Sequence, residues 1–301
     1  MLSRKNKLLI TKALSLFSVV RGYNILVIVI AQYLTSIYIL APQLPLGDVV
    51  FDPNLLMLVL ASAVAIAGGY IINNFYDSEK DLINRPRKSM LDRLVSQRTK
   101  LSVYFVLNFM SVVFASYVSF RAVIFFSAYI FGIWLYSHKF KRITGLGNII
   151  AAMLSVTPFF AVFIYYSNFD TVIFVHATFL FLLLWMREVV KDLENLKGDL
   201  TLNYRTVPVV FGEHPAKGLI TALCISTLIP IILLLTYYEV GYMDYYFYAS
   251  GLALIGFLVV LWRSKRKLHY LILHGLLKGI IVLGVFSIVL INVDLILKRF
   301  L

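Results

Sequence analysis

The most regular feature of the chain is the alternation of long apolar runs with short polar segments. Most runs are close to the roughly 20 apolar residues that a transmembrane helix needs. They are continuous, whereas the strands of a membrane barrel alternate apolar and polar positions. We therefore predict an all-α, polytopic membrane bundle of about nine transmembrane helices. The expected spans are residues 15–40, 55–76, 101–120, 122–137, 146–166, 171–188, 217–237, 245–262 and 275–297.

The composition supports the same class of protein. Of 301 residues, 60% are hydrophobic and 14% are charged, whereas a soluble domain has about 45–50% apolar and about 25% charged residues. These values exclude an ordinary soluble enzyme and a disordered chain, and the single cysteine excludes a disulfide scaffold. We expect one membrane-embedded domain over residues 1–301, in which residues 1–14 form a short cytoplasmic segment.

The positive charge predicts the orientation of the bundle. A formal net charge of +13 would suggest a nucleic-acid partner in a soluble protein. Here most of the Lys and Arg residues fall in alternate loops, and residues 41–54, 167–170 and 238–244 contain none. The positive-inside rule then places the N-terminus in the cytoplasm and the C-terminus outside. The first run is too long for a signal peptide. We expect an integral protein of the cell (inner) membrane without a nucleic-acid partner.

Acidic residues are scarce, and two clusters stand out at expected cytoplasmic helix ends. Asn73, Asp77 and Asp81 follow one another at intervals of four, which keeps them on one face of a helix. Asp192 and Asp199 are seven residues apart and return to within about 20° of each other if their helix continues that far. Each cluster is therefore expected to present two aligned carboxylates where a helix leaves the bilayer.

Aligned carboxylates repel each other unless a cation lies between them. Mg²⁺ usually binds through one or two carboxylates, while substrate phosphates and water complete its coordination. Two such clusters suit two Mg²⁺ ions that bridge a diphosphate, with Lys and Arg neutralising the remaining charge. For a single pair of acids, a solvated helix end is the better interpretation. Two clusters in a chain so poor in charge favour the metal site.

These segments resemble the signatures of the UbiA superfamily of intramembrane prenyltransferases. Asn73, Asp77 and Asp81 resemble its N-D-x-x-D-x-x-x-D signature, and the continuation Ile83-Asn84-Arg85-Pro86 is similar too. A second signature, D-x-x-D-x-x-G-D followed by R-T-L-P-V-x-x-G, resembles Asp192, Asn195, Gly198 and Asp199 with the segment from Arg205 to Gly212. The segment Tyr136-Ser137-His138-Lys139-Phe140-Lys141-Arg142, ahead of Gly147-Asn148, is similar to a third family segment.

Three positions depart from the family pattern. Asn74 and Asn195 each stand where the family usually has Asp, so two carboxylates are missing. After Pro86 the usual P-I-P-S-G-like run is replaced by the basic segment 87–93. Because that loop borders the reaction chamber in the family, these departures bear on the metal site and on the identity of the acceptor.

The resemblance implies Mg²⁺-dependent transfer of a polyprenyl group from a prenyl diphosphate donor to a small acceptor within the lipid membrane, with release of diphosphate. It assigns metal binding to Asp77, Asp81, Asp192 and Asp199, with Asn73 as an oxygen ligand. Donor binding falls to the polar and basic residues Arg21, Asn24, Ser137, Lys139, Lys141, Arg142 and Arg205. Tyr136 is expected beside the allylic carbon, where an aromatic face stabilises a cation.

Several alternatives remain open from the sequence. Arg21 lies in an apolar run, where a charge indicates function, but its side chain can instead snorkel to the interface. A membrane transporter also places charges inside a bundle, although it would place the acids near the bilayer midplane. Another membrane phosphate-handling transferase is a further alternative. For the acceptor, an aromatic quinone precursor and a prenylated glyceryl phosphate are both compatible with the residues.

Overall fold

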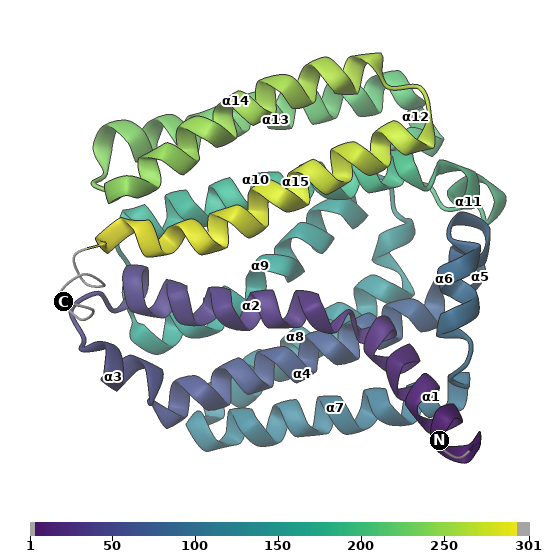
Figure 1. Ribbon diagram of the computed structural model, residues 1–301, viewed down its shortest axis with the longest axis horizontal. Helices are drawn as coiled ribbons and strands as arrows, with labels where there is room; N and C mark the ends of the chain where they lie inside the picture. Colours follow the sequence, from purple (N-terminus) through teal and green to yellow (C-terminus); the bar gives the residue numbers. More distant parts are fainter. Residues whose placement is uncertain (1–3, 294–301) are drawn as a thin grey trace. The chain divides into compact units, whose positions relative to one another are not determined.

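A computed structural model describes residues 4–293 of the chain (Figure 1). Within these residues every regular element is a helix, and nine helical segments are long and apolar enough to cross a membrane. The protein is therefore an integral, multi-pass, all-α membrane protein, as the sequence predicts. The nine spans are Gly22–Leu40, Pro53–Tyr76, Gln97–Val118, Phe120–Arg142, Leu146–Tyr166, Thr171–Glu194, Glu213–Tyr237, Gly241–Arg263 and Lys267–Asn292. The expected end of the last span, residues 294–297, lies outside the described residues, as do residues 1–3.

The first expected span, residues 15–40, is interrupted in the structure. Helix α1 (Arg4–Val20) ends one residue before Arg21, whose φ of 51° lies in the left-handed region, and α2 (Gly22–Thr35) starts directly after it. A non-glycine residue rarely adopts this conformation. The membrane span therefore begins at Gly22, and it ends with a π-helical turn, η1 (Ser36–Leu40).

The turn between the third and fourth spans is centred on Ser119 rather than on Arg121. Ser119 has extended backbone angles between α7 (Gln97–Val118) and α8 (Phe120–His138), and its hydroxyl accepts a hydrogen bond from the Ala122 N–H at 3.1 Å. This is an N-cap, which satisfies one of the free N–H groups at a helix start. Arg121 accordingly lies within the first turn of α8.

The chain divides into two compact units. Unit 1 comprises Met1–Val29, Asp52–Phe140 and Lys197–Asn203, and unit 2 comprises Ile30–Phe51, Lys141–Leu196 and Tyr204–Leu301. Shorter helices join the spans: α3 (Leu46–Val50), α5 (Ser78–Asn84), α6 (Pro86–Asp92), η2 (Phe140–Arg142), α11 (Leu196–Thr201), α12 (Val207–Phe211), η3 (Gly241–Met243) and η4 (Ile288–Asn292). The expectation of one domain stays a prediction.

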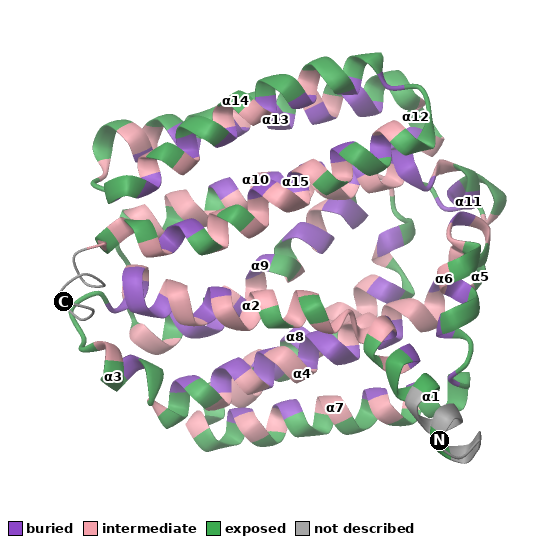
Figure 2. Ribbon diagram, viewed as in Figure 1, coloured by how far each residue is buried: buried purple, intermediate pink, exposed green. Residues whose placement is uncertain are grey.

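Unit 1 is built on α4 (Pro53–Tyr76), which packs against α1, α7 and α8. Buried residues follow α4 along much of its length (Figure 2), and α4 and α7 run side by side (Figure 1). Gly68 lies at this close approach, and a Cβ there would lie 2.8 Å from the Asn108 amide oxygen, so the Asn108 side chain would have to shift. Ser111 donates to the Ala61 carbonyl across the same interface at 2.9 Å. The site candidates at the C-terminal end of α4 thus rest on a fixed support.

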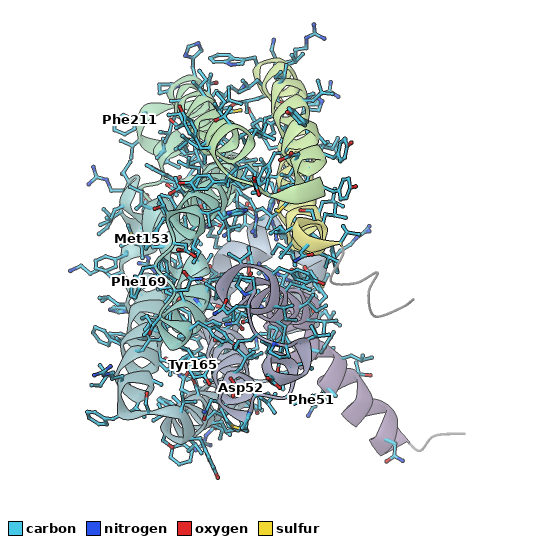
Figure 3. All side chains as sticks on the ribbon, turned by 90° about the vertical axis from the view of Figure 1, so that its left-hand side faces the viewer. Phe51, Asp52, Met153, Tyr165, Phe169 and Phe211 are labelled. Carbon is cyan, nitrogen blue, oxygen red and sulfur yellow. The ribbon has the colours of Figure 1, made fainter. Side chains whose placement is uncertain are left out.

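Unit 2 is built on α10 (Thr171–Glu194), which packs against α9 (Leu146–Tyr166), α13 (Glu213–Tyr237) and α15 (Lys267–Ser287). Helix α14 (Asp244–Arg263) packs on α13 and α15. Large apolar side chains such as Met153, Phe169 and Phe211 lie on the outside of this unit (Figure 3). Of these three residues, Met153 lies within a membrane span, where an exposed apolar side chain suits a surface facing lipid, since lipid tails are equally apolar.

Candidate active site

The first acidic segment lies where α4 ends and α5 begins. Asp77 separates the two helices, yet the four-residue hydrogen-bond pattern passes through it: its N–H donates to the Asn73 carbonyl at 2.9 Å, and the Asp81 N–H donates to the Asp77 carbonyl at 2.8 Å. The one-face spacing of Asn73, Asp77 and Asp81 is therefore kept. Asp77 is buried, with 9% of its surface exposed.

The electrostatics of this segment favour a bound cation. Burial raises the pKa of the Asp81 carboxyl above its ordinary value, and the neighbouring charge of Asp77 raises it further. The positive charges of Arg85, Arg21 and Lys88 act in the opposite direction. Two carboxylates that hinder each other's ionisation are stabilised together by a cation between them.

The second acidic segment does not continue as one helix. Helix α10 ends at Glu194, Asn195 caps it by donating its N–H to the Lys191 carbonyl at 3.0 Å, and a new helix begins at Leu196. The condition for Asp192 and Asp199 to share a helix face is therefore not met. They belong to different units, because residues 197–203 are part of unit 1.

Asp199 is held against the first acidic segment inside unit 1. Its fully buried carboxylate forms an ion pair with the Lys80 ammonium of α5 at 2.6 Å. One residue earlier, the Gly198 N–H donates to the Asn84 side-chain oxygen at 3.1 Å. A Cβ at position 198 would collide with the Asn84 amide, so glycine is needed for this approach. The two sequence segments are thereby linked through α5.

In unit 2, Asp192 is fixed by a neighbour from another helix. The Asn148 side-chain amide, at the start of α9, donates to the Asp192 carboxylate at 2.7 Å. Asn148 was not assigned a role from the sequence, although it stands in the Gly147-Asn148 pair of the third family segment.

A second network at the end of α10 joins it to α15. The Arg187 guanidinium donates to Nε2 of His274 at 3.1 Å, and Nδ1 of His274 lies 2.9 Å from the Glu194 carboxylate. Because arginine can only donate, Nε2 must be the acceptor, and Nδ1 therefore bears the hydrogen that Glu194 accepts. The end of α10 that contains Asp192 is held in place by this chain of contacts.

Asn74, where the family usually has Asp, serves as a bridge between two charged side chains. Its amide oxygen accepts a hydrogen bond from the Lys100 ammonium at 2.8 Å, and its amide nitrogen donates to the Asp92 carboxylate at 3.2 Å. The Ser18 hydroxyl also donates to Asp92, at 3.4 Å. A carboxylate that this chain lacks at position 74 is thus present at Asp92, buried in the same network.

The donor-binding candidates occupy different environments. Within unit 1 the Arg21 guanidinium lies over the Tyr70 ring, 5.2 Å from its centre, and the Asn24 amide donates to the Tyr70 hydroxyl at 3.3 Å. Ser137 is buried and its hydroxyl has no hydrogen-bond partner among the described residues, whereas Lys139 is exposed. Tyr136 is half-buried.

In unit 2, Lys141 is buried, with 9% of its surface exposed. The exposed Arg142 guanidinium lies 4.9 Å from the centre of the Tyr204 ring. Arg205 is exposed, and its carbonyl accepts a hydrogen bond from the Thr144 hydroxyl at 2.8 Å. Among the basic candidates of this unit, Lys141 alone is buried.

The metal-ligand candidates fit Mg²⁺ only in part when no substrate is bound. No group of three or more His, Cys, Asp or Glu side chains is placed to hold a metal ion anywhere within residues 4–293. The carboxylate and amide oxygens of Asn73, Asp77 and Asp81 are nevertheless the hard ligands that Mg²⁺ prefers. Since Mg²⁺ is commonly bound by one or two carboxylates together with substrate phosphates, this set fits a site that a diphosphate completes.

Unit 2 also contains an apolar cavity of about 130 Å³. Its lining comes from α2, η1, α9, α10 and α15 and includes Phe159, Phe163, Ala177 and Leu183. His176 is one of its few polar lining residues: Nδ1 contacts the Val172 carbonyl at 2.9 Å, and Nε2 has no partner among the described residues. A cavity of this composition suits a hydrocarbon chain.

Comparisons with known proteins find a matching family and similar chains. The family model described as UbiA prenyltransferase family matches residues 15–269. A digeranylgeranylglyceryl phosphate synthase from Thermococcus gammatolerans is 30% identical over 193 residues, which cover 64% of this chain and 69% of the relative.

Solved structures show the same fold. A structure that concerns digeranylgeranylglyceryl phosphate synthase in membranes has a TM-score of 0.70 and 18% identity, covering 93% of this chain and 98% of that chain. A UbiA homologue from Archaeoglobus fulgidus bound to GPP and Mg²⁺ has a TM-score of 0.67 and 14% identity, covering 91% of this chain and 99% of that chain.

Proposed function

Because the chain belongs to the UbiA prenyltransferase family, we propose that it transfers a prenyl group from a prenyl diphosphate to a prenylated glyceryl phosphate within the membrane. In this reaction the bond between the prenyl carbon and the diphosphate oxygen breaks, and the diphosphate leaves with the electron pair. An ether bond forms to the acceptor hydroxyl, whose proton is released. We expect the departure of the diphosphate to require Mg²⁺.

The observation that supports this acceptor is the similarity to digeranylgeranylglyceryl phosphate synthases. The Thermococcus gammatolerans enzyme reaches 30% identity, and a structure concerning the same kind of enzyme shares the fold. An aromatic quinone precursor is the competing acceptor, and the assay below distinguishes the two.

We assign Mg²⁺ binding to Asp77, Asp81, Asp192 and Asp199, with Asn73 as a neutral oxygen ligand. When bound, the metal neutralises the charge that develops on the departing diphosphate. Binding of Mg²⁺ with GPP in the Archaeoglobus fulgidus homologue supports this assignment. Asp199 would then share its charge between the metal and Lys80, and Asn148 would keep Asp192 oriented.

The remaining candidates bind and shield the donor. We assign the diphosphate oxygens to Lys141 and Arg21, supported by Lys139, Arg142, Arg205 and Asn24. Tyr136 and Ser137 would lie next to the allylic carbon, where an aromatic face stabilises positive charge and excludes water. The apolar cavity of unit 2 would hold part of a prenyl chain.

We further propose that the N-terminus and both acidic segments face the cytoplasm in the cell (inner) membrane. The distribution of Lys and Arg between alternate loops supports this sidedness. Cysteines introduced at Ser78 and at Ser167 into a Cys224→Ala background would test it. A membrane-impermeant thiol reagent applied to intact cells should label position 167 and not position 78; the opposite pattern would refute the orientation.

The acceptor is tested by competition. Purified protein in lipid receives labelled prenyl diphosphate, Mg²⁺ and equal concentrations of a prenylglyceryl phosphate and an aromatic quinone precursor. The proposal predicts a dialkylated glyceryl phosphate as the labelled product. A labelled aromatic product would replace the proposed acceptor, while the prenyltransferase activity itself would stand.

A further inference from the structure

The segment that replaces the usual family loop is a docked helix rather than a loose loop. The Leu91 carbonyl of α6 accepts a hydrogen bond from the Ser15 hydroxyl at 2.8 Å. Asp92, the last residue of α6, accepts hydrogen bonds from Ser18 of α1 at 3.4 Å and from Asn74 of α4 at 3.2 Å. Three hydrogen bonds from two elements of unit 1, α1 and α4, thus fix the position and the rotation of α6.

This docking turns one face of α6 toward α1 and α4. Lys88 and Asp92 are four residues apart and lie on the same face of the helix. Asp92 accepts a hydrogen bond from Ser18. Arg21 is three residues after Ser18, and the Arg21 N–H donates to the Ser18 carbonyl at 3.2 Å. Lys88 is accordingly close to Arg21, which is the strongest charged neighbour of its ammonium, followed by Asp92, Asp81 and Arg85.

Lys88 is a half-buried cation whose ammonium makes no direct contact with an anion. Within residues 4–293 it forms neither a hydrogen bond nor an ion pair with another described residue. Asp92 is already bonded to Asn74 and Ser18. Burial lowers the pKa of the Lys88 ammonium and the charge of Arg21 lowers it further. An anion held between Lys88 and Arg21 would remove this repulsion.

We propose that Lys88 binds the phosphate group of the glyceryl phosphate acceptor, beside Arg21. This inference rests on the proposed function, because an aromatic acceptor offers no such phosphate. Lys88 is not among the cations that we assign to the donor diphosphate, so we assign its charge to a second anionic group, with Arg21 shared by both. Lys88 is therefore a determinant of acceptor specificity.

The chain offers a matched control on the same helix. Arg87 precedes Lys88, is exposed, and makes no hydrogen bond or ion pair with the part of the chain that the structure describes. Arg87→Gln removes one positive charge from α6, as Lys88→Gln does, but from a face about 100° away around the helix. Lys88→Arg keeps the charge and serves as the conservative variant.

The test measures initial rates with each substrate varied in turn. Losing one charge-assisted contact to phosphate corresponds to a rise in KM of roughly ten- to a hundredfold. We expect this rise for the phosphorylated acceptor in Lys88→Gln, an unchanged KM for the prenyl diphosphate, and near wild-type values in Lys88→Arg and Arg87→Gln. With a prenylglycerol that lacks the phosphate, wild type and Lys88→Gln should be equally slow.

An unchanged acceptor KM in Lys88→Gln would overturn the inference while the proposed function stands. An equal rise in the KM for the donor would overturn it too, because it would place Lys88 at the diphosphate. If wild-type protein prenylates only an aromatic acceptor, the proposed function fails and this inference fails with it. An unchanged donor KM also shows that Lys88→Gln is folded.

Discussion

Because Asn74 bridges Lys100 and Asp92, we expect that a carboxylate can be moved from position 92 to position 74 without loss of stability. Lys100 is 1% exposed and Asp92 is 3% exposed, and the Asn74 amide lies between them at 2.8 Å and 3.2 Å. Asp92→Asn removes the carboxylate to which the buried ammonium is linked through Asn74. The two charges are bridged rather than in direct contact, so we take about 2 kcal/mol, within the range for a hydrogen bond to a charged group. We therefore expect a fall of roughly 4–8 °C in the unfolding midpoint.

Adding Asn74→Asp to this variant should restore the stability. The double variant has the same total charge as the wild-type protein. Its new carboxylate at position 74 lies directly beside the Lys100 ammonium, and the new amide at position 92 can donate a hydrogen bond to that carboxylate. The assay is thermal unfolding in detergent with bound lipid, followed by intrinsic fluorescence. Equal midpoints for Asp92→Asn and wild type would refute the role of Asp92. A double variant no more stable than Asp92→Asn would refute the bridge.

Three further predictions concern the acidic segments and the cavity. Asp77→Asn should lower kcat by about 100-fold or more, since a preorganised electrostatic contact to the reacting charge is lost, whereas Glu79→Gln, an exposed neighbour on α5, should stay near wild type in the same rate assay. Lys80→Met removes the ammonium 2.6 Å from the buried Asp199 carboxylate and should lower stability by about 3 kcal/mol; an unchanged unfolding midpoint would contradict this. Ala177→Phe fills the cavity of unit 2 and should lower turnover of long prenyl donors more than that of short ones. Equal effects on donors of every length would exclude the cavity as a binding site for the prenyl chain.

The transmembrane pattern could be predicted from the sequence because hydropathy is a local property. The nine spans agree in number and order with those of the described residues. The helix break at Arg21 was not predicted, because apolar residues continue on both sides of the Arg21-Gly22 pair and read as one run. Likewise, α10 continues to Glu194, beyond the expected end at residue 188, and Glu194 and Arg187 there contact His274 of a distant helix.

The acidic residues illustrate the same limit. The spacing of Asn73, Asp77 and Asp81 was predictable, because backbone hydrogen bonds four residues apart maintain it through the junction at Asp77. The position of Asp199 was not, because the chain turns at Asn195 and then packs against α5 through a contact more than a hundred residues away in sequence. The partners of Asn74 are also non-local. A single Lys at the start of an apolar span, Lys100, was the one available signal.

The central claim is that this protein joins a prenyl group to a prenylglyceryl phosphate with loss of diphosphate. The most direct measurement is the ratio of diphosphate released to dialkylated glyceryl phosphate formed, with purified protein in lipid and with or without Mg²⁺. The account predicts a ratio near one with Mg²⁺ and no turnover after EDTA treatment, restored when Mg²⁺ is added back. Turnover that survives EDTA, or that persists in both Asp77→Ala and Asp192→Ala, would contradict it.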